Sequence, residues 1–124
     1  MPIRQAKAVA FVATAQPEQA LRFYRDVLGL TLTEDSPFAI VFDAFGTMLR
    51  VQKASAVTPA PYTAFGLEVP DIVAAVRELA RAGIEPVRYP SFDQDELGIW
   101  RAPSGARVFW FHDPDRNLLS LHQL

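Results

Sequence analysis

The feature that most constrains the fold of this chain is an internal repeat. Ala10-Phe11 and Ala64-Phe65 lie 54 residues apart, and so do Gly29-Leu30 and Gly83-Ile84. The first two pairs fall in apolar runs typical of strands and the other two follow helix-like segments, so strand, helix and stop recur in register. We therefore predict two copies of one unit, produced by an internal duplication.

In the first copy, the apolar run at residues 8–13 predicts a strand, and residues 18–28 predict a helix. Pro17 suits the first turn of this helix and Gly29 suits its C-terminal cap. The apolar helix positions share one face: Ala20, Leu21, Tyr24, Val27 and Leu28. Three β-like runs follow, at 30–33, 38–42 and 47–51. The small, proline-containing residues 53–61 predict a linker.

The second copy repeats this order, with a strand at 63–68, a helix at 72–82 capped by Asp71, and a stop at Gly83. Further strands are predicted at 85–88, 97–101 and 107–112, and an acidic loop at 91–96. A turn at 113–117 leads into the last strand. Each copy is therefore βαβββ, with one extra strand-like piece in the second.

The ratio of helices to strands predicts an α+β fold. One helix for three or four strands covers only one face of a sheet, so the other face stays open. Two such units in tandem form a curved mixed sheet with helices outside and an open concave trough, suited to a small organic ligand. The expected organisation is a single domain, 1–124, with module one at about 5–52, a linker at about 53–61 and module two at about 62–124. A sheet edge suits a homodimer contact.

Composition narrows the function classes. A chain of 124 residues with 50% hydrophobic and 21% charged residues is typical of one soluble domain. The 12 basic and 14 acidic residues give a net charge of -2, which argues against nucleic-acid and membrane partners. The absence of cysteine excludes disulfides and thiolate chemistry, and no apolar run has the length of a signal peptide or membrane helix. We expect a soluble, cytoplasmic protein.

Two motifs resemble one known family. Arg22-Phe-Tyr-Arg-Asp-Val-Leu-Gly-Leu30 is similar to the phrase that ends the first helix in the vicinal oxygen chelate superfamily, the glyoxalase, bleomycin-resistance and extradiol-dioxygenase superfamily. Asp113-Pro-Asp-Arg-Asn117 resembles the Asp-Pro-Asp-Gly-Asn turn of that family. The resemblance covers essentially the whole chain, since both βαβββ halves are accounted for. It implies the fold but does not specify a reaction.

The metal enzymes of that superfamily place His or Glu ligands at four trough-facing positions, on the first and last strands of each half. Carried over to this chain, those positions hold no good ligand. They are occupied by Ala8, Val9 or Ala10, by Arg50, by Ala64 with Tyr62 and Thr63 nearby, and by Ser120. A guanidinium never loses its proton and cannot bind a cation. We expect no metal and no cofactor.

The two histidines do not replace the missing ligands. If residues 113–117 close a hairpin, 112 faces 118, 110 faces 120, and 108 faces 122. His112 and His122 then lie roughly 13 Å apart at about 3.3 Å per residue, too far to share one ion. We expect both to be polar strand-end residues, with a hydrogen-bonding role in the trough as the alternative for His122. No partner with which His122 could restore the metal site is expected in its reach.

Period-two alternation assigns the strand residues to two faces. The trough face is predicted to hold Ala8, Ala10, Met48, Arg50, Gln52, Ala64, Gly66, Val108, Trp110, Leu118, Ser120 and His122. The large apolar face under the helices is predicted to hold Val9, Phe11, Leu49, Val51, Phe65, Leu67, Phe109, Phe111, Leu119 and Leu121.

Seven residues are candidates for ligand binding: Arg50, Trp110, Ser120, His122, Met48, Gln52 and Trp100. Arg50 either binds a ligand carboxylate or phosphate or pairs with Glu68 or an acid of a dimer partner. Trp110 either stacks a planar ligand or belongs to the core. The acidic run Asp93-Gln-Asp-Glu96, next to Trp100, is either a rim that moves over the trough or a solvated loop.

These residues favour a metal-independent small-molecule binding protein whose ligand lies in the trough. One alternative is a glyoxalase-like lyase, isomerase or dioxygenase, with metal or as a metal-free variant using Arg50 and His122. The other is a non-catalytic interaction module with a filled trough. No catalytic residue can be assigned, because no nucleophile and base occur at a spacing that specifies a reaction.

Overall fold

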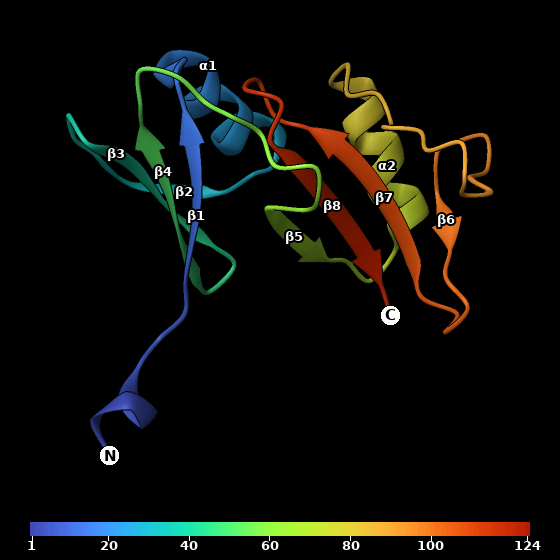
Figure 1. Ribbon diagram of the computed structural model, residues 1–124, viewed down its shortest axis with the longest axis horizontal. Helices are drawn as coiled ribbons and strands as arrows, with labels where there is room; N and C mark the ends of the chain where they lie inside the picture. The colour runs from blue at the N-terminus through green and yellow to red at the C-terminus, as the bar shows by residue number, and fades with distance from the viewer. The chain divides into compact units, whose positions relative to one another are not determined.

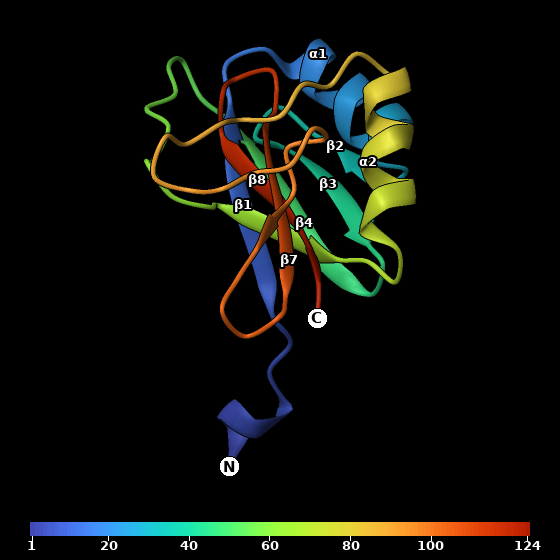
Figure 2. The ribbon, with the colours of Figure 1, turned by 90° about the vertical axis from the view of Figure 1, so that its right-hand side faces the viewer.

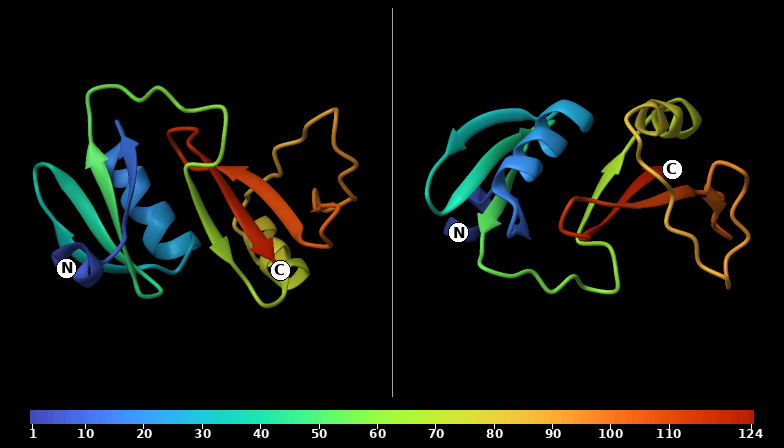
Figure 3. Two further views of the ribbon diagram at one scale, coloured as in Figure 1. Left: turned by 60° about the horizontal axis from the view of Figure 1, so that its bottom comes forward. Right: turned by 90° about the horizontal axis from the view of Figure 1, so that it is seen from above.

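The structure is a computed structural model that describes all 124 residues. The chain forms two compact units, Met1–Val57 and Thr58–Leu124. Each unit contains one four-stranded mixed sheet with helical structure on one of its faces (Figures 1 and 3). The predicted α+β class and the recurrence of one topology in both halves are confirmed. Neither α-helix is long and apolar enough to cross a bilayer.

The first unit contains sheet A, in the strand order β1-β4-β3-β2. Its strands are β1 Val9–Thr14, β2 Thr31–Asp35, β3 Ala39–Ala44 and β4 Thr47–Lys53. The β1–β4 pair is parallel and the other pairs are antiparallel. A short 3₁₀ turn, η1 Pro2–Gln5, precedes β1 and projects away from the sheet (Figure 2).

The second unit contains sheet B, in the corresponding order β5-β8-β7-β6. Its strands are β5 Phe65–Glu68, β6 Trp100–Arg101, β7 Arg107–His112 and β8 Leu118–Gln123. Again the pair formed by the first and last strands is parallel, and the others are antiparallel. The two halves that repeat in sequence thus fold into sheets with the same strand order.

The helix of the first unit differs in form from the predicted one. It starts as α1, Pro17–Arg22, and continues as a π-helical turn, η2 Phe23–Val27, which the Leu28 amide closes by donating to the Phe23 carbonyl at 3.1 Å. This wider turn contains the fully buried Tyr24, whose ring lies 5.8 Å from that of Phe42 in β3. Gly29 ends the segment at φ 77°, where a residue with a Cβ is strained.

The helix of the second unit, α2 Ile72–Arg81, is regular, and two side chains cap its N-terminus. The Asp71 carboxylate accepts a hydrogen bond from the Ala74 amide, as predicted, and the Gln123 side chain accepts one from the Ile72 amide. Its buried residues are Ile72, Val76 and Leu79. The strand residues buried on the helix side of sheet B are Phe109, Phe111, Leu119 and Leu121. Burial of these side chains is the main stabilising term of the unit.

Two strand predictions in the second unit are wrong. Residues 85–88 form no strand, and the strand predicted at 97–101 is reduced to Trp100–Arg101. Pro86 has no amide hydrogen to donate to a ladder, and only Val87 bonds to the sheet, through its amide and the Trp110 carbonyl at 2.8 Å. Gly98 has φ 92°, and a Cβ there would lie 2.4 Å from Pro86 Cβ. The chain therefore crosses itself closely at Gly98 instead of extending.

The prediction of which strand residues share a face is wrong for β1. It agrees with the observed pairing for β4, β5, β7 and β8. Val9 pairs with Met48 and Phe11 with Arg50, and parallel partners point to the same side of a sheet. Val9, Phe11 and Ala13 therefore share the face of Met48, Arg50 and Gln52, while Ala10, Val12 and Thr14 face the helix. Both alternating sets of this strand are almost entirely apolar, so periodicity carried no information about which set is buried.

Candidate functional site

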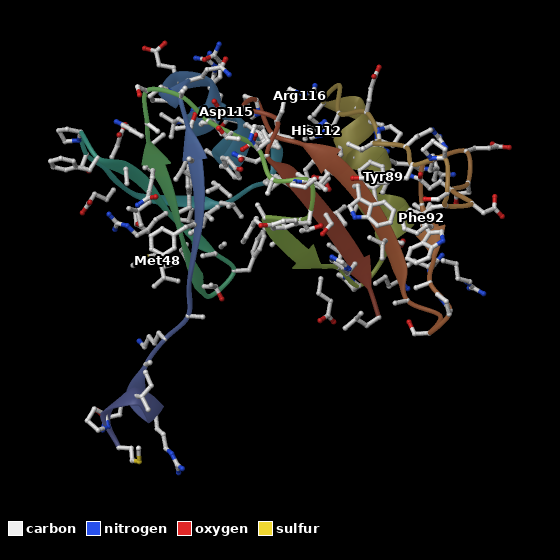
Figure 4. All side chains as sticks on the ribbon, in the orientation of Figure 1. Met48, Tyr89, Phe92, His112, Asp115 and Arg116 are labelled. Atoms are coloured by element: carbon white, nitrogen blue, oxygen red, sulfur yellow. The ribbon has the colours of Figure 1, made fainter.

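The open face of sheet A is the face opposite its helix, and it presents exposed apolar side chains. Val9 is 40% exposed, Phe11 51% and Met48 43% (Figure 4 labels Met48). Val9 and Phe11 belong to the outer strand β1 and Met48 to its neighbour β4, so together they form an exposed apolar surface of the kind that a ligand or partner can cover. Ala13 and Gln52 form the next pair along β1 and β4 after Phe11 and Arg50, and they point to the same face.

Arg50 lies in the middle of this open face. On one side it pairs with Phe11 of β1, and on the other with Val41 of β3. The residue is half-buried, and it takes no part in the ion pairs Arg25–Asp26 and Lys53–Asp35. Arg50 therefore has no ion-pair partner within its own unit. Its predicted pairing with Glu68, which belongs to the other unit, stays a prediction.

A cavity of about 240 Å³ crosses one end of this open face, from β1 to β2. Its polar groups belong to Lys7, Thr33 and Asp43. The Thr33 hydroxyl donates to the Val41 carbonyl at 3.1 Å, at the point where a bulge shifts the register between β2 and β3. The remaining lining residues are Ala8, Val9, Phe42, Gly46 and Met48. Sequence reasoning missed this cavity, because it depends on the corrected face of β1.

On the open face of sheet B, the last hairpin has the predicted register. Trp110 pairs with Ser120, Val108 with His122 and His112 with Leu118. The Asp113 carboxylate holds the turn by accepting hydrogen bonds from the amides of Asp115 and Asn117, both at 2.9 Å. This turn therefore fixes which side of the sheet Ser120 faces.

Ser120 and His122 form a hydrogen-bonded pair that was not predicted. Ser120 Oγ lies 2.7 Å from His122 Nε2, and Ser120 is only 1% exposed. Gly66 of β5 pairs with Ser120, and a Cβ there would lie 3.0 Å from Ser120 Oγ and 3.2 Å from His122 Nε2. This hydrogen bond agrees with the alternative expected for His122, a hydrogen-bonding residue on this face. Residues i and i+2 of a strand share a face, which was the available signal.

This pair does not form an accessible nucleophile and base. A serine nucleophile must reach an electrophilic atom of a substrate, and the Ser120 side chain is buried. The hydrogen bond instead satisfies a buried hydroxyl and fixes the His122 ring. Its role in the structure is therefore positional.

Trp110 lies within a cluster of four aromatic rings. It stacks on Phe92 at 5.4 Å and 15° and on Trp100 at 5.8 Å and 28°, and the Tyr89 ring meets it edge-on at 5.2 Å. Figure 4 shows Tyr89 and Phe92 side by side next to β7. The ring face predicted to stack a planar ligand is therefore in contact with the protein's own side chains. Trp110 and Trp100 stay half-buried.

The acidic segment is tied to the chain around it. The Arg88 guanidinium donates to the carbonyls of Asp95 and Glu96, both at 3.0 Å. The Gln94 amide donates to the carbonyls of Val87 and Gly98 and accepts from the Tyr89 amide. The Asp95 carboxylate accepts from the amides of Leu97 and Ile99. These hydrogen bonds tie the segment to the neighbouring backbone, while the side chains of Asp93, Asp95 and Glu96 stay exposed, as the solvated-loop alternative expects.

His112 begins the turn and is labelled with Asp115 and Arg116 in Figure 4. Burial lowers the pKa of His112, and the nearby cation of Arg116 acts in the same direction, while Asp113 raises it. Because Val108, four residues earlier on β7, is the partner of His122, the two histidines are far apart along the hairpin. The predicted separation of the histidines is consistent with this register.

The residues at the four positions that hold metal ligands in the related enzymes cannot bind a metal ion in this chain. No group of three or more His, Cys, Asp or Glu side chains lies together. With the corrected face, β1 offers Val9, and the other positions hold Arg50, Ala64 and Ser120. A divalent metal needs several N, O or S donors within about 2–2.5 Å, and a guanidinium provides none.

Comparison with known proteins identifies the family. The model of the Glyoxalase/Bleomycin resistance protein/Dioxygenase superfamily matches residues 6–121, whereas no curated protein matches. A superfamily member from Sphaerobacter thermophilus is 24% identical, with a TM-score of 0.76 over 96% of this chain and 97% of that one. Lactoylglutathione lyase from Agrobacterium tumefaciens is 18% identical, with a TM-score of 0.74 over 96% and 93%.

The fosfomycin resistance protein FosX from Listeria monocytogenes is 11% identical, with a TM-score of 0.77 over 97% of this chain and 93% of that one. At these identities, the likeness to solved structures is a likeness of fold. The match to the family model spans nearly the whole chain. With its two βαβββ units and its two sequence motifs, this chain belongs to the Glyoxalase/Bleomycin resistance protein/Dioxygenase superfamily.

Proposed function

We propose that this protein binds a small anionic organic molecule on the open face of sheet A, without a metal ion. The observation that carries the proposal is Arg50, a half-buried residue whose guanidinium has no ion-pair partner in its unit, beside the exposed apolar side chains of Phe11 and Met48 on the same face. A partly desolvated charge is costly unless it is paired, so a ligand carboxylate or phosphate is the group that this position favours.

The residues around Arg50 suggest the rest of the ligand. Phe11 and Met48 flank the guanidinium on the same face, and both are about half exposed. An apolar or aromatic body bound beside the anionic group would remove this surface from water, at roughly 25 cal/mol per Å² of apolar area. The ligand class is therefore an organic anion with an apolar body.

The proposal that binding needs no metal is supported by the lack of any cluster of three or more His, Cys, Asp or Glu side chains. It can be tested directly. Elemental analysis of purified protein should find no stoichiometric nickel, zinc, iron or manganese. One tightly bound metal ion per chain would refute this part of the proposal and favour the lyase, isomerase or dioxygenase alternative. The homodimer, the trough between the halves and the cytoplasmic location stay predictions.

The binding test uses chelator-treated protein and a panel of alkyl and aromatic carboxylates and phosphates in a thermal-shift assay. At least one member of the panel should raise the melting temperature. Arg50→Gln should abolish the shift, whereas Arg77→Gln, on the exposed side of α2, should leave it unchanged. A panel with no stabilising member, or a shift that survives Arg50→Gln, would count against the proposal.

A further inference from the structure

We infer that the ligand is a zwitterion, with its anionic group on Arg50 and an amino group on Asp43, joined by an apolar spacer. This inference rests on the proposed function and extends it, because it identifies the chemistry at the other end of the same open face. It is carried by the position of Asp43 in the cavity and by the side chains between Asp43 and Arg50.

Asp43 and Arg50 occupy neighbouring rows of one face. Asp43 pairs with Met48, and Arg50 follows two residues later on the same strand. With about 4.8 Å between strands and about 3.3 Å per residue along a strand, their Cα atoms are roughly 8 Å apart. Neither residue takes part in an ion pair. The opposite charges are therefore on one surface but do not neutralise each other.

The Asp43 carboxylate is held in place by the adjacent hairpin turn. Its Oδ1 accepts a hydrogen bond from the Gly46 amide at 2.9 Å. The two turn residues, Phe45 and Gly46, have φ values of 52° and 104°, which is the primed turn that a two-residue hairpin favours. Oδ1 is thus held by the backbone, and the carboxylate, whose negative charge both oxygens share, belongs to a residue that lines the cavity. A fixed carboxylate of this kind favours an ammonium group over a neutral methyl.

The surface between the two charges is apolar. Met48 lies in both the row of Asp43 and the strand of Arg50, and Val9 and Phe11 flank it on β1. The cavity of about 240 Å³ is lined by Asp43 and Met48 but not by Arg50, so it would take the amino end of such a ligand. An alkyl spacer of about six to eight carbons, with C–C bonds of about 1.5 Å, matches the distance of roughly 8 Å between the Cα atoms of Asp43 and Arg50.

Two other charged side chains lie on or near this face. Lys7 lines the cavity from the segment before β1, so two strand spacings, about 10 Å, separate it from the strand of Asp43. Glu34 pairs with Val41 in the row of Arg50, but it does not line the cavity. Glu34 is therefore the matched control for Asp43, because it is an exposed acid on the same face.

The test compares straight-chain ω-amino acids of about four to twelve carbons with fatty acids of equal length, by isothermal titration calorimetry. The amino acids should bind roughly two- to fivefold more tightly than the matched fatty acids, as expected for one exposed charge pair, with an optimum at intermediate length. Asp43→Asn should remove this difference, since asparagine keeps an oxygen for the Gly46 amide but loses the charge. Glu34→Gln should preserve it.

The outcomes separate this inference from the proposed function. If fatty acids bind as tightly as the amino acids, or if Asp43→Asn keeps the preference, the zwitterion is refuted. In that case, loss of all binding in Arg50→Gln would still support the anion site. If neither series binds to the wild-type protein, both this inference and the proposed anion site fail for alkyl ligands of this length.

Discussion

The turn at Asp113–Asn117 predicts that one substitution stabilises the protein. Arg116 has φ 66°, in the left-handed region, and its amide donates to the Asp113 carbonyl at 2.9 Å. The Asn117 side chain donates to Asp113 Oδ2 at 2.9 Å, and the Asp113 amide donates to the Asn117 carbonyl. These bonds hold Arg116 in a conformation that its Cβ disfavours. We expect Arg116→Gly to relieve this strain.

The magnitude follows from two opposing effects. A left-handed conformation costs a residue with a Cβ about 1–2 kcal/mol, and glycine gives back about 0.5–1 kcal/mol through the entropy of the unfolded chain. The net gain in the free energy of unfolding is about 0.5–1 kcal/mol, or about 2–5 °C in melting temperature for a chain of this length. Urea denaturation followed by tryptophan fluorescence measures it.

Two control variants test the reasoning. Gly29 has φ 77°, and no atom lies within 4 Å of the position that an added Cβ would take, so Gly29→Ala should destabilise by about 1 kcal/mol through conformation alone. Ala82 has φ -88°, so Ala82→Gly should destabilise by about 0.5–1 kcal/mol. If both controls behave in this way and Arg116→Gly is neutral or destabilising, the strain argument is refuted.

Three further predictions concern the second unit. Gly66→Ala should disrupt the Ser120–His122 hydrogen bond and lower the free energy of unfolding by about 1–3 kcal/mol, measured by urea denaturation. In a Ser120→Ala background the same substitution should cost less, and an unchanged cost would contradict this explanation. The pKa of His112 in the folded state is lowered from the ordinary value of 6.5. The folded state therefore favours neutral His112, so the free energy of unfolding should be highest above pH 6.5 and should decrease as the pH falls from 6.5 through the folded pKa. An NMR titration should show this pKa rising in Arg116→Gly, and an unchanged value would contradict an effect of the Arg116 charge on His112. Phe92→Ala should free the Trp110 ring, change the tryptophan emission and cost about 1 kcal/mol, whereas unchanged emission would argue against the ring cluster.

The topology was predictable because the repeat carries positional information. Gly29 and Gly83 both end helices with positive φ, and that requirement is readable in sequence. The register of the last hairpin was predictable for a similar reason, since the turn after His112 sets every pairing up to Arg107 with Gln123. Local backbone chemistry determined both features.

The candidate site was less predictable, because it depends on choices that local sequence does not encode. The strand containing Val9 and Phe11 is apolar on both faces, so only its pairing with β4 reveals which side is open. The segment before Trp100 has no periodicity, and its order comes from Gln94 and Arg88, whose partners are backbone carbonyls several residues away. Such contacts are specific to the folded chain.

The bulge in β2 also affects how this protein behaves at high concentration. β2 forms one outer edge of sheet A, and its unpaired backbone groups are a template for a strand of another molecule. The register shift at Thr33 interrupts that template, and Glu34 and Asp35 add negative charge directly after it. This edge is thus protected against intermolecular strand pairing, so straightening the bulge by deletion of Thr33 is expected to promote aggregation more than loss of the fold.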